Sequence, residues 1–247
     1  MNKIKKMNVS VITPFFDESE EILNRNVKSV SESIEWGNME GEVEQIIVVD
    51  TNDYCKIQIA RQIMDRYDHA FVLENSCNMG LPFSRNNGIK NSSGEYIMLL
   101  DSDDMFSKGK IRYQIDFMRQ NNLDHSCGGY REIHGDKPPY TEKLEQILPP
   151  VFDRNYLYQM NNICYCGSNC FKRNLIKKIG YFDEKLTGVG AEDLEYWIRI
   201  AKSGAKMASI QKVLYYLGVH SNNMTGRYTR EGRFEKAFAY IKEKHNL

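Results

Sequence analysis

Two aspartates lie two residues apart directly after an apolar run, and this spacing suits metal chemistry. The run YIMLL (residues 96–100) is followed by Asp101, Ser102 and Asp103. On a turn, both carboxylates can reach one cation. Mg²⁺ and Mn²⁺ prefer such oxygen ligands, together with the oxygens of a diphosphate. The alternative interpretation is that these acids cap the N-terminus of a helix over residues 108–120.

Acidic residues also follow two other apolar runs. Asp17 and Glu18 follow the first run of the chain, and Asp50 and Asp53 follow the run QIIVV (residues 45–49). Ligands of parallel sheets bind outside the carboxyl ends of the strands, so acids at three strand ends can converge. A single acid at such a place is usually a turn residue or a helix cap. Three clusters on one edge indicate a functional site.

The segments that would position these acids alternate between two patterns. Continuous apolar runs predict buried strands, and apolar residues at helical spacing predict helices. The alternation predicts an α/β fold with a mostly parallel sheet and helices on both faces. In chain order we expect strand 9–13, helix 20–36, strand 45–49, helix 57–67, strand 70–73, helix 81–90 and strand 96–100.

The second half of the chain is less regular. Residues 136–150 contain four prolines and mixed charges, which predicts a surface loop or a short irregular helix. Around it we expect helix 110–120, strand 124–133, strand 167–171, helix 175–179, helix 191–203, strand 213–219 and a terminal helix 228–245.

The composition is that of an ordinary globular chain. Of 247 residues, 41% are hydrophobic and 27% charged, and 33 basic residues balance 33 acidic ones. Proteins that bind nucleic acid usually have a basic excess, so we expect no nucleic-acid partner. No apolar run reaches the roughly 18 residues that span a bilayer, and no secretory core follows the first lysines. These features predict a cytoplasmic protein without a transmembrane segment.

Six cysteines fit the cytoplasm as reduced thiols. Three are isolated, and Cys164, Cys166 and Cys170 are clustered on an expected strand. A zinc site would need a fourth ligand at regular spacing, and none is near. We therefore interpret the cysteines as small buried side chains.

Five motifs in one order give the chain a family resemblance. Around GEYIMLLDSDD (residues 94–104) lie NMG (78–80), RNNG (85–88), GYFDE (180–184) and GAEDLEYWIRI (190–200). With these motifs the chain resembles the family 2 glycosyltransferases of the nucleotide-diphospho-sugar transferase (GT-A) fold. The resemblance runs from VSVITPFFDE (residues 9–18) to YYLGVHSNNMT (215–225), nearly the whole chain.

The resemblance implies an activity. It implies an inverting hexosyl- or N-acetylhexosaminyl-transferase that depends on Mn²⁺ or Mg²⁺. The donor would be a nucleotide-diphosphate sugar with uridine as the expected base, and the acceptor a hydroxyl of a glycan, a lipid-linked sugar or a protein. The processive-synthase motif Gln-x-x-Arg-Trp is absent, which favours transfer of single sugars.

The resemblance also implies roles for single residues. Asp193 would be the general base and Glu192 would support it or contact the acceptor. Both could instead be acids favoured in the first turn of a helix. The expected metal ligands are Asp103, Asp101 and His220, and the expected donor-binding residues are Thr13, Pro14, Phe16, Glu18, Asp50, Arg85, Asp101 and Ser102.

One departure from the family pattern affects the base. After the second strand the family often has Asp-Asp-Gly-Ser, whereas this chain has DTND (residues 50–53). Thr51 therefore stands where family members often recognise the base, and this turn gives weaker support for uridine as the base.

Two further interpretations stay open. A catalytically inactive nucleotide-sugar-binding module would share the fold. A nucleotidyltransferase or a dehydrogenase would need glycines after the first strand, and residues 9–21 have none. The basic and aromatic residues 227–247 predict a helix packed on the core or one lying on the inner face of a membrane.

The expected organisation is one domain in three parts. Residues 1–104 would bind the nucleotide sugar, and residues 105–226 would bind the acceptor and carry catalysis. Residues 227–247 would form the C-terminal helix. Within the second part, residues 106–163 would choose the acceptor.

Overall fold

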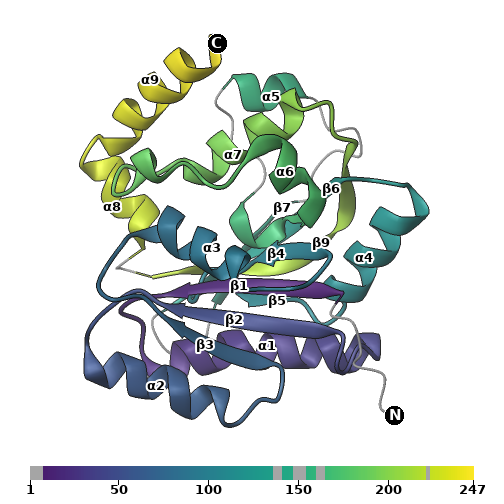
Figure 1. The fold of residues 1–247 in the computed structure, drawn as a ribbon, viewed down its shortest axis with the longest axis vertical. Coiled ribbons are helices and arrows are strands. Elements are labelled where there is room, and N and C mark those ends of the chain that lie inside the picture. The colour runs from purple at the N-terminus through teal and green to yellow at the C-terminus, as the bar shows by residue number, and fades with distance from the viewer. Residues whose placement is uncertain (1–7, 136–140, 147–153, 160–164, 221–222) are drawn as a thin grey trace.

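The computed structural model describes residues 8–135, 141–146, 154–159, 165–220 and 223–247. Its strands form one sheet in the order β3-β2-β1-β4-β8-β6-β9-β5, and β7 pairs with β6 (Figure 1). The strands are β1 (Val9–Phe15), β2 (Val43–Val49), β3 (Ala70–Glu74), β4 (Tyr96–Leu99), β5 (Met105–Phe106), β6 (His125–His134), β7 (Thr141–Gln146), β8 (Cys170–Lys172) and β9 (Met207–Val219).

The first half of the sheet is parallel, as the sequence predicts. Strands β3, β2, β1 and β4 are parallel neighbours. Every residue of β1 and β2 is buried, because helices cover both faces of these strands. The helices that connect the four strands are α1 (Glu20–Gly37), α2 (Tyr54–Met64) and α3 (Leu81–Lys90).

The second half of the sheet is mixed. Strand β8 is antiparallel to both β4 and β6, β6 and β9 are parallel, and β5 is antiparallel to β9. Strand β9 begins at Met207, earlier than the predicted start at residue 213. The C-terminal end of β9 reaches the edge of the sheet where the loops after β1 and β4 lie.

Two layers of helices cover the sheet. In Figure 1, α1 and α2 lie below it, and α3 and α7 lie above it. Neighbouring residues of a strand point to opposite faces of the sheet. Val11 belongs to the hydrophobic cluster that includes residues of α1 and α4, and Ile12 belongs to the cluster that includes Trp197 of α7. The remaining helices are α4 (Lys110–Gln120), α5 (Arg154–Tyr158), α6 (Ile176–Ile179), α7 (Glu192–Lys202), α8 (Met224–Arg230) and α9 (Arg233–His245).

Three sequence predictions were wrong. The strand expected over residues 167–171 begins only at Cys170, because Cys166–Ser168 form a turn of 3-10 helix. Residues 136–150 were expected to lack a strand, but β7 pairs antiparallel with β6. The four prolines flank the β7 segment and do not interrupt it, so its backbone can still pair. The expected single helix 228–245 is two helices, because Gly232 takes the left-handed conformation (φ 63°) at the start of α9.

Among the described cysteines, three are buried and two are exposed. Cys127, Cys166 and Cys170 are buried free thiols, as expected, and Cys164 lies outside the described residues. Cys55 and Cys77 are exposed free thiols, so the expectation of burial was wrong for these two. In the described part of the chain, no helix is long and apolar enough to cross a membrane.

Candidate active site

Helix α1 holds the turn that carries the Asp101–Asp103 pair. The side-chain amide of Asn26 donates to the backbone oxygens of Asp101 and Asp104, at 2.8 and 2.9 Å. Helix α4 begins later, with Gly109 as its N-cap. The capping alternative is therefore excluded, and the two acids are available for another role.

Asp103 lies against the end of β9. Its Oδ2 is 3.0 Å from His220 Nε2, and Asn223 Nδ2 donates to the same oxygen at 3.1 Å. The two backbones approach closely because residue 218 is glycine, where a Cβ would lie 2.3 Å from the Asp103 carbonyl oxygen. The fold thus brings two predicted metal ligands together across 117 residues of sequence.

Arg85 of α3 joins two acids from different parts of the chain. It is 1% exposed. Its Nη2 donates to Asp101 Oδ1 at 2.8 Å, and its Nη1 donates to Glu192 Oε1 at 2.6 Å. Burial alone would lower the pKa of Arg85, but these carboxylates outweigh it and raise the pKa well above its ordinary value. Arg85 is a permanent positive charge between the β4 end and α7.

Two more carboxylates increase the negative charge of this turn. Asp104 is buried and accepts from Gly218 N at 2.8 Å. Burial, with the charges of Asp103 and Asp101, raises the pKa of Asp104 well above its ordinary value. Burial also raises the pKa of Glu18, beside Asp103. Such clustering of acids favours a bound cation.

The predicted base lies in the first turn of α7. Ala191, the residue before the helix, has φ 60°, a left-handed conformation that costs energy for a residue with a Cβ. Glu192 is buried and bonded to Arg85, while Asp193 Oδ1 accepts from Leu194 N at 2.7 Å. The strained turn therefore sets two adjacent acids into different surroundings.

A cavity of about 690 Å³ brings these groups together. The predicted residues that line it are Arg85, Asp101, Glu192, Asp193 and His220. Asp103 borders it through its bond to His220. The cavity is large enough for a substrate of the size of a nucleotide or disaccharide.

Apart from Arg85 and Asp101, the residues predicted to bind the donor do not line the cavity. Thr13 and Pro14 are buried in β1, and Thr13 Oγ1 accepts from Gln45. Phe16 follows β1 with 47% of its surface exposed. The Asp50 carboxylate accepts from Asn75 and from the backbone N–H groups of residues 79 and 80. Ser102 is buried next to Glu18, which the pKa of Glu18 reflects through a hydrogen bond.

Some cavity residues were missed at the sequence level. Tyr215 of β9 is fully buried, and among the described residues its hydroxyl has no hydrogen-bond partner. Asp104 and Asn223 also line the cavity. All three lie within motifs of the family resemblance, Asp104 in residues 94–104 and Tyr215 and Asn223 in residues 215–225, but the motifs alone did not assign them a role. The C-terminal helices contribute Met224, Tyr228, Arg230, Phe234 and Phe238 to the lining.

The protein groups in the cavity suit a divalent cation whose remaining ligands come from the diphosphate of the substrate. Within the described residues, no group of three His, Cys, Asp or Glu side chains could hold a metal alone. Mn²⁺ and Mg²⁺ often take only one or two protein ligands when a diphosphate supplies the others. Asp103 and His220 provide a carboxylate and an imidazole at one place, whereas Asp101 is already paired with Arg85.

The chain is similar to known proteins over most of its length. The model of Glycosyl transferase family 2 matches residues 10–180. TuaG of Bacillus subtilis (strain 168), named for teichuronic acid biosynthesis, is 31% identical over 79% of this chain and 73% of that protein. WfaP of Escherichia coli, named UDP-Glc:alpha-D-GlcNAc-diphosphoundecaprenol beta-1,3-glucosyltransferase, is 26% identical over 76% of this chain and 70% of that protein.

A solved structure shares the fold. TarS 1-349 of S. aureus, crystallised in complex with UDP-GlcNAc, aligns with TM-score 0.67 and 19% identity, over 89% of this chain and 61% of that one. This likeness confirms the predicted GT-A fold. The chain spans 30% of the length of an uncharacterized glycosyltransferase of Rickettsia bellii and 20% of one of Rickettsia conorii.

Proposed function

The chain belongs to glycosyl transferase family 2, and we propose that it moves a single sugar from a UDP-linked donor to a hydroxyl of a glycan or lipid-linked acceptor, with inversion. The observation that carries the proposal is the cavity shared by the first turn of α7 and the acidic turn after β4. UDP as the carrier is supported by the donor in WfaP's name and by the TarS complex.

Asp193 acts as the general base. The acceptor oxygen forms a bond to the anomeric carbon while the bond from that carbon to the diphosphate oxygen breaks. The acceptor proton passes to the Asp193 carboxylate, and UDP leaves with its electron pair. One displacement from the opposite face inverts the carbon. A base positioned in this way typically contributes ~10²–10⁴-fold to the rate.

Asp103 and His220 would hold the divalent cation, Mn²⁺ or Mg²⁺. Such a cation offsets the negative charge that the departing diphosphate gains. Arg85 keeps Glu192 and Asp101 in place, and Asp101 would contact the donor ribose or the surroundings of the cation. This division of roles is supported by the contacts of Asp103 with His220 and of Arg85 with both acids.

The remaining donor contacts lie along the ends of β1 and β2. Phe16 contacts the base, the buried Thr13, Pro14 and Asp50 shape the strand ends beneath it, and Glu18 and Ser102 lie towards the diphosphate. The exposed ring of Phe16 supports this placement, since it can stack on a base. Residues 1–104 thus serve the donor and 105–226 the acceptor and catalysis. A lipid-linked acceptor would place the enzyme at the inner face of a membrane.

Donor binding is tested first by thermal stability. UDP-glucose and UDP-N-acetylglucosamine are added with Mn²⁺ or with chelator. A ligand at 100 times its dissociation constant stabilises the folded protein by about 2.7 kcal/mol. We expect stabilisation that needs Mn²⁺ and is lost in Asp103→Asn. Asp53→Asn is the matched control, because Asp53 also follows a strand but caps α2. Stabilisation indifferent to metal and to Asp103→Asn would refute the metal role.

Turnover separates the enzyme from an inactive binding module. Asp193→Asn should keep the UDP-induced stabilisation and lose at least ~10²-fold in UDP release with acceptor present. Transfer near the wild-type rate would mean that the base lies elsewhere. Donor binding without turnover in the wild type, across all acceptors offered, would favour the inactive module.

A further inference from the structure

One wall of the cavity is aromatic and comes from the C-terminal hairpin of α8 and α9. Tyr228, Phe234 and Phe238 line the cavity. The Tyr228 and Phe234 rings meet edge to face with centroids 6.1 Å apart, and the Phe234 and Phe238 rings are stacked at 6.0 Å. All three side chains are half-buried. The rings therefore form a continuous surface that still offers area to a ligand.

Gly190 seats this surface directly beside the catalytic turn. A Cβ at residue 190 would lie 2.7 Å from Phe234 Cε1 and 3.0 Å from Tyr228 Cδ2. Gly190 also has φ 87°, which only glycine adopts readily. Residue 190 is three positions before Asp193, so the two rings are packed against the same short stretch of backbone that presents the base.

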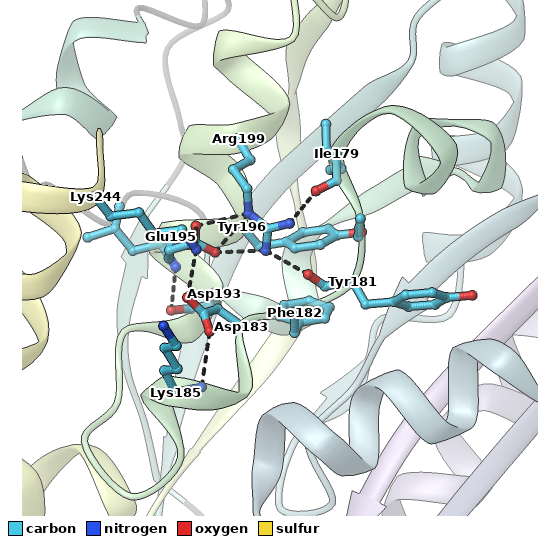
Figure 2. A network of polar contacts seen from close by, with 12 residues as sticks. Ile179, Tyr181, Phe182, Asp183, Lys185, Asp193, Glu195, Tyr196, Arg199 and Lys244 are labelled. Atoms are coloured by element: carbon cyan, nitrogen blue, oxygen red, sulfur yellow. Dashed lines mark hydrogen bonds and ion pairs between the residues drawn. The ribbon is translucent and has the colours of Figure 1, made fainter. Parts of the chain in front are cut away.

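The hairpin is anchored to Glu195 of α7 and to the preceding Asp183 by ion pairs and a hydrogen bond (Figure 2). Lys244 Nζ lies 2.6 Å from Asp183 Oδ2 and 2.8 Å from Glu195 Oε1, and the Tyr240 hydroxyl donates to Asp183 at 2.6 Å. Ile241 is fully buried in the same contact. The aromatic wall is thus held rigidly relative to α7, which is a condition for precise positioning of a substrate.

Carboxylates and aromatic rings therefore face one space. We propose that Tyr228 and Phe234 form the acceptor subsite, where a pyranose ring of the acceptor stacks so that one of its hydroxyl groups points to Asp193. This rests on the proposed function of the same cavity.

The chemistry of the walls matches a sugar. A pyranose ring has a face of C–H groups, which suits the negative face of an aromatic ring, and an edge of hydroxyl groups, which suits carboxylates. A lipid tail carries no hydrogen-bonding groups for the carboxylates of Glu192 and Asp193, whereas a sugar offers them several hydroxyl groups. The acceptor sugar belongs either to a glycan or to a lipid diphosphate that carries it.

Three variants test the subsite. Phe234→Leu and Tyr228→Leu remove a ring face but keep an apolar side chain. Ile241→Val is the matched control, since it loosens the packing of α9 away from the cavity. Each protein is saturated with UDP and Mn²⁺ and titrated with methyl β-D-glucopyranoside, methyl N-acetyl-β-D-glucosaminide and a short-chain N-acetylglucosaminyl diphosphate lipid. UDP affinity is measured alongside.

We expect at least one sugar probe to bind the wild type and Ile241→Val alike. Loss of either ring should weaken that binding about tenfold, which is 1.4 kcal/mol, with UDP affinity unchanged. The proposal is overturned if no sugar probe binds while UDP does, if the ring variants bind like wild type, or if Ile241→Val shows the same loss. A loss of UDP affinity in the ring variants would instead assign the rings to the base.

Two controls complete the design. The lipid diphosphate without its sugar should not compete with the methyl glycosides; competition would assign the rings to the lipid and overturn the proposal. If the sugar-bearing lipid binds more tightly than both methyl glycosides, the natural acceptor is a lipid-linked sugar. If it binds as they do, the acceptor is a glycan. Failure of UDP itself to bind would count against the proposed function.

Discussion

Arg85 is the residue on which the two halves of the site meet. It comes from α3, and its partners follow β4 and begin α7. Removing one partner of a buried ion pair leaves the other charge uncompensated, which is costlier than losing an exposed pair. At the residue scale, the stability of the site therefore depends on a group that the proposed reaction does not itself consume.

Arg85→Met should lower the free energy of unfolding by about 3 kcal/mol, because it leaves the carboxylates of Asp101 and Glu192 without their positive partner. Arg61→Met is the control: Arg61 pairs with Glu74 at 2.7 Å on the surface, where such pairs contribute ~0–1 kcal/mol. Urea unfolding of both variants gives the comparison. Similar losses in the two would show that the Arg85 network adds nothing to stability.

At the element scale, the C-terminal hairpin is part of the site. The basic face of α9 pairs with acids of the core, and Ala237 and Ile241 are buried. This supports the interpretation of residues 227–247 as a segment packed on the core. Glu195 is fully buried, and burial would raise its pKa, but hydrogen bonds and charges from Arg199 and Lys244 lower it. The acid is thus kept ionised to hold the hairpin.

Lys244→Met should loosen α9 without unfolding α7. The side chain is 30% exposed, so we expect a loss of only about 1 kcal/mol, or roughly fivefold faster hydrogen exchange at the amides of α9. Lys242→Met, an exposed position on the same helix, is the control. Unchanged exchange in Lys244→Met, or an equal change in Lys242→Met, would contradict the anchoring role.

At the scale of the whole molecule, the buried His125 contributes to the loss of stability in acid. His125 of β6 is fully buried under Trp197, with ring centroids 5.4 Å apart, and Nε2 lies 2.7 Å from Asn169 Oδ1. Burial lowers its pKa from 6.5 to about 4. The folded protein therefore holds His125 neutral where the unfolded chain would protonate it.

The sign of the effect follows from this difference. Above pH 6.5 both states are neutral at His125 and stability is complete. As the pH falls from 6.5 to about 4, the unfolded state gains the proton first, so stability is lost. At pH 5 the loss is about 2 kcal/mol. His125→Gln, which keeps a donor for Asn169, should lose that much less between pH 7 and pH 5 in urea unfolding. Equal losses would show that other groups set the acid limit.

The sequence by itself determined the elements whose signal is local. Helices α3 and α4 have the predicted bounds, and β1, β2 and β4 lie where continuous apolar runs predict them. The periodicity of a buried face is written into consecutive residues, so it can be read without knowing the partner. The motif order likewise indicated the family and the acids at 101, 103 and 193.

Only the tertiary structure decided what those acids contact. The pairing of Arg85 with Glu192 spans 107 residues, and that of Asp103 with His220 spans 117. Strand β7 exists because β6 offers it a backbone partner, and Tyr228 and Phe234 reach the cavity because Gly190 leaves room for their rings. Such contacts depend on distance in space, which the order of residues along a chain does not contain until the chain is folded.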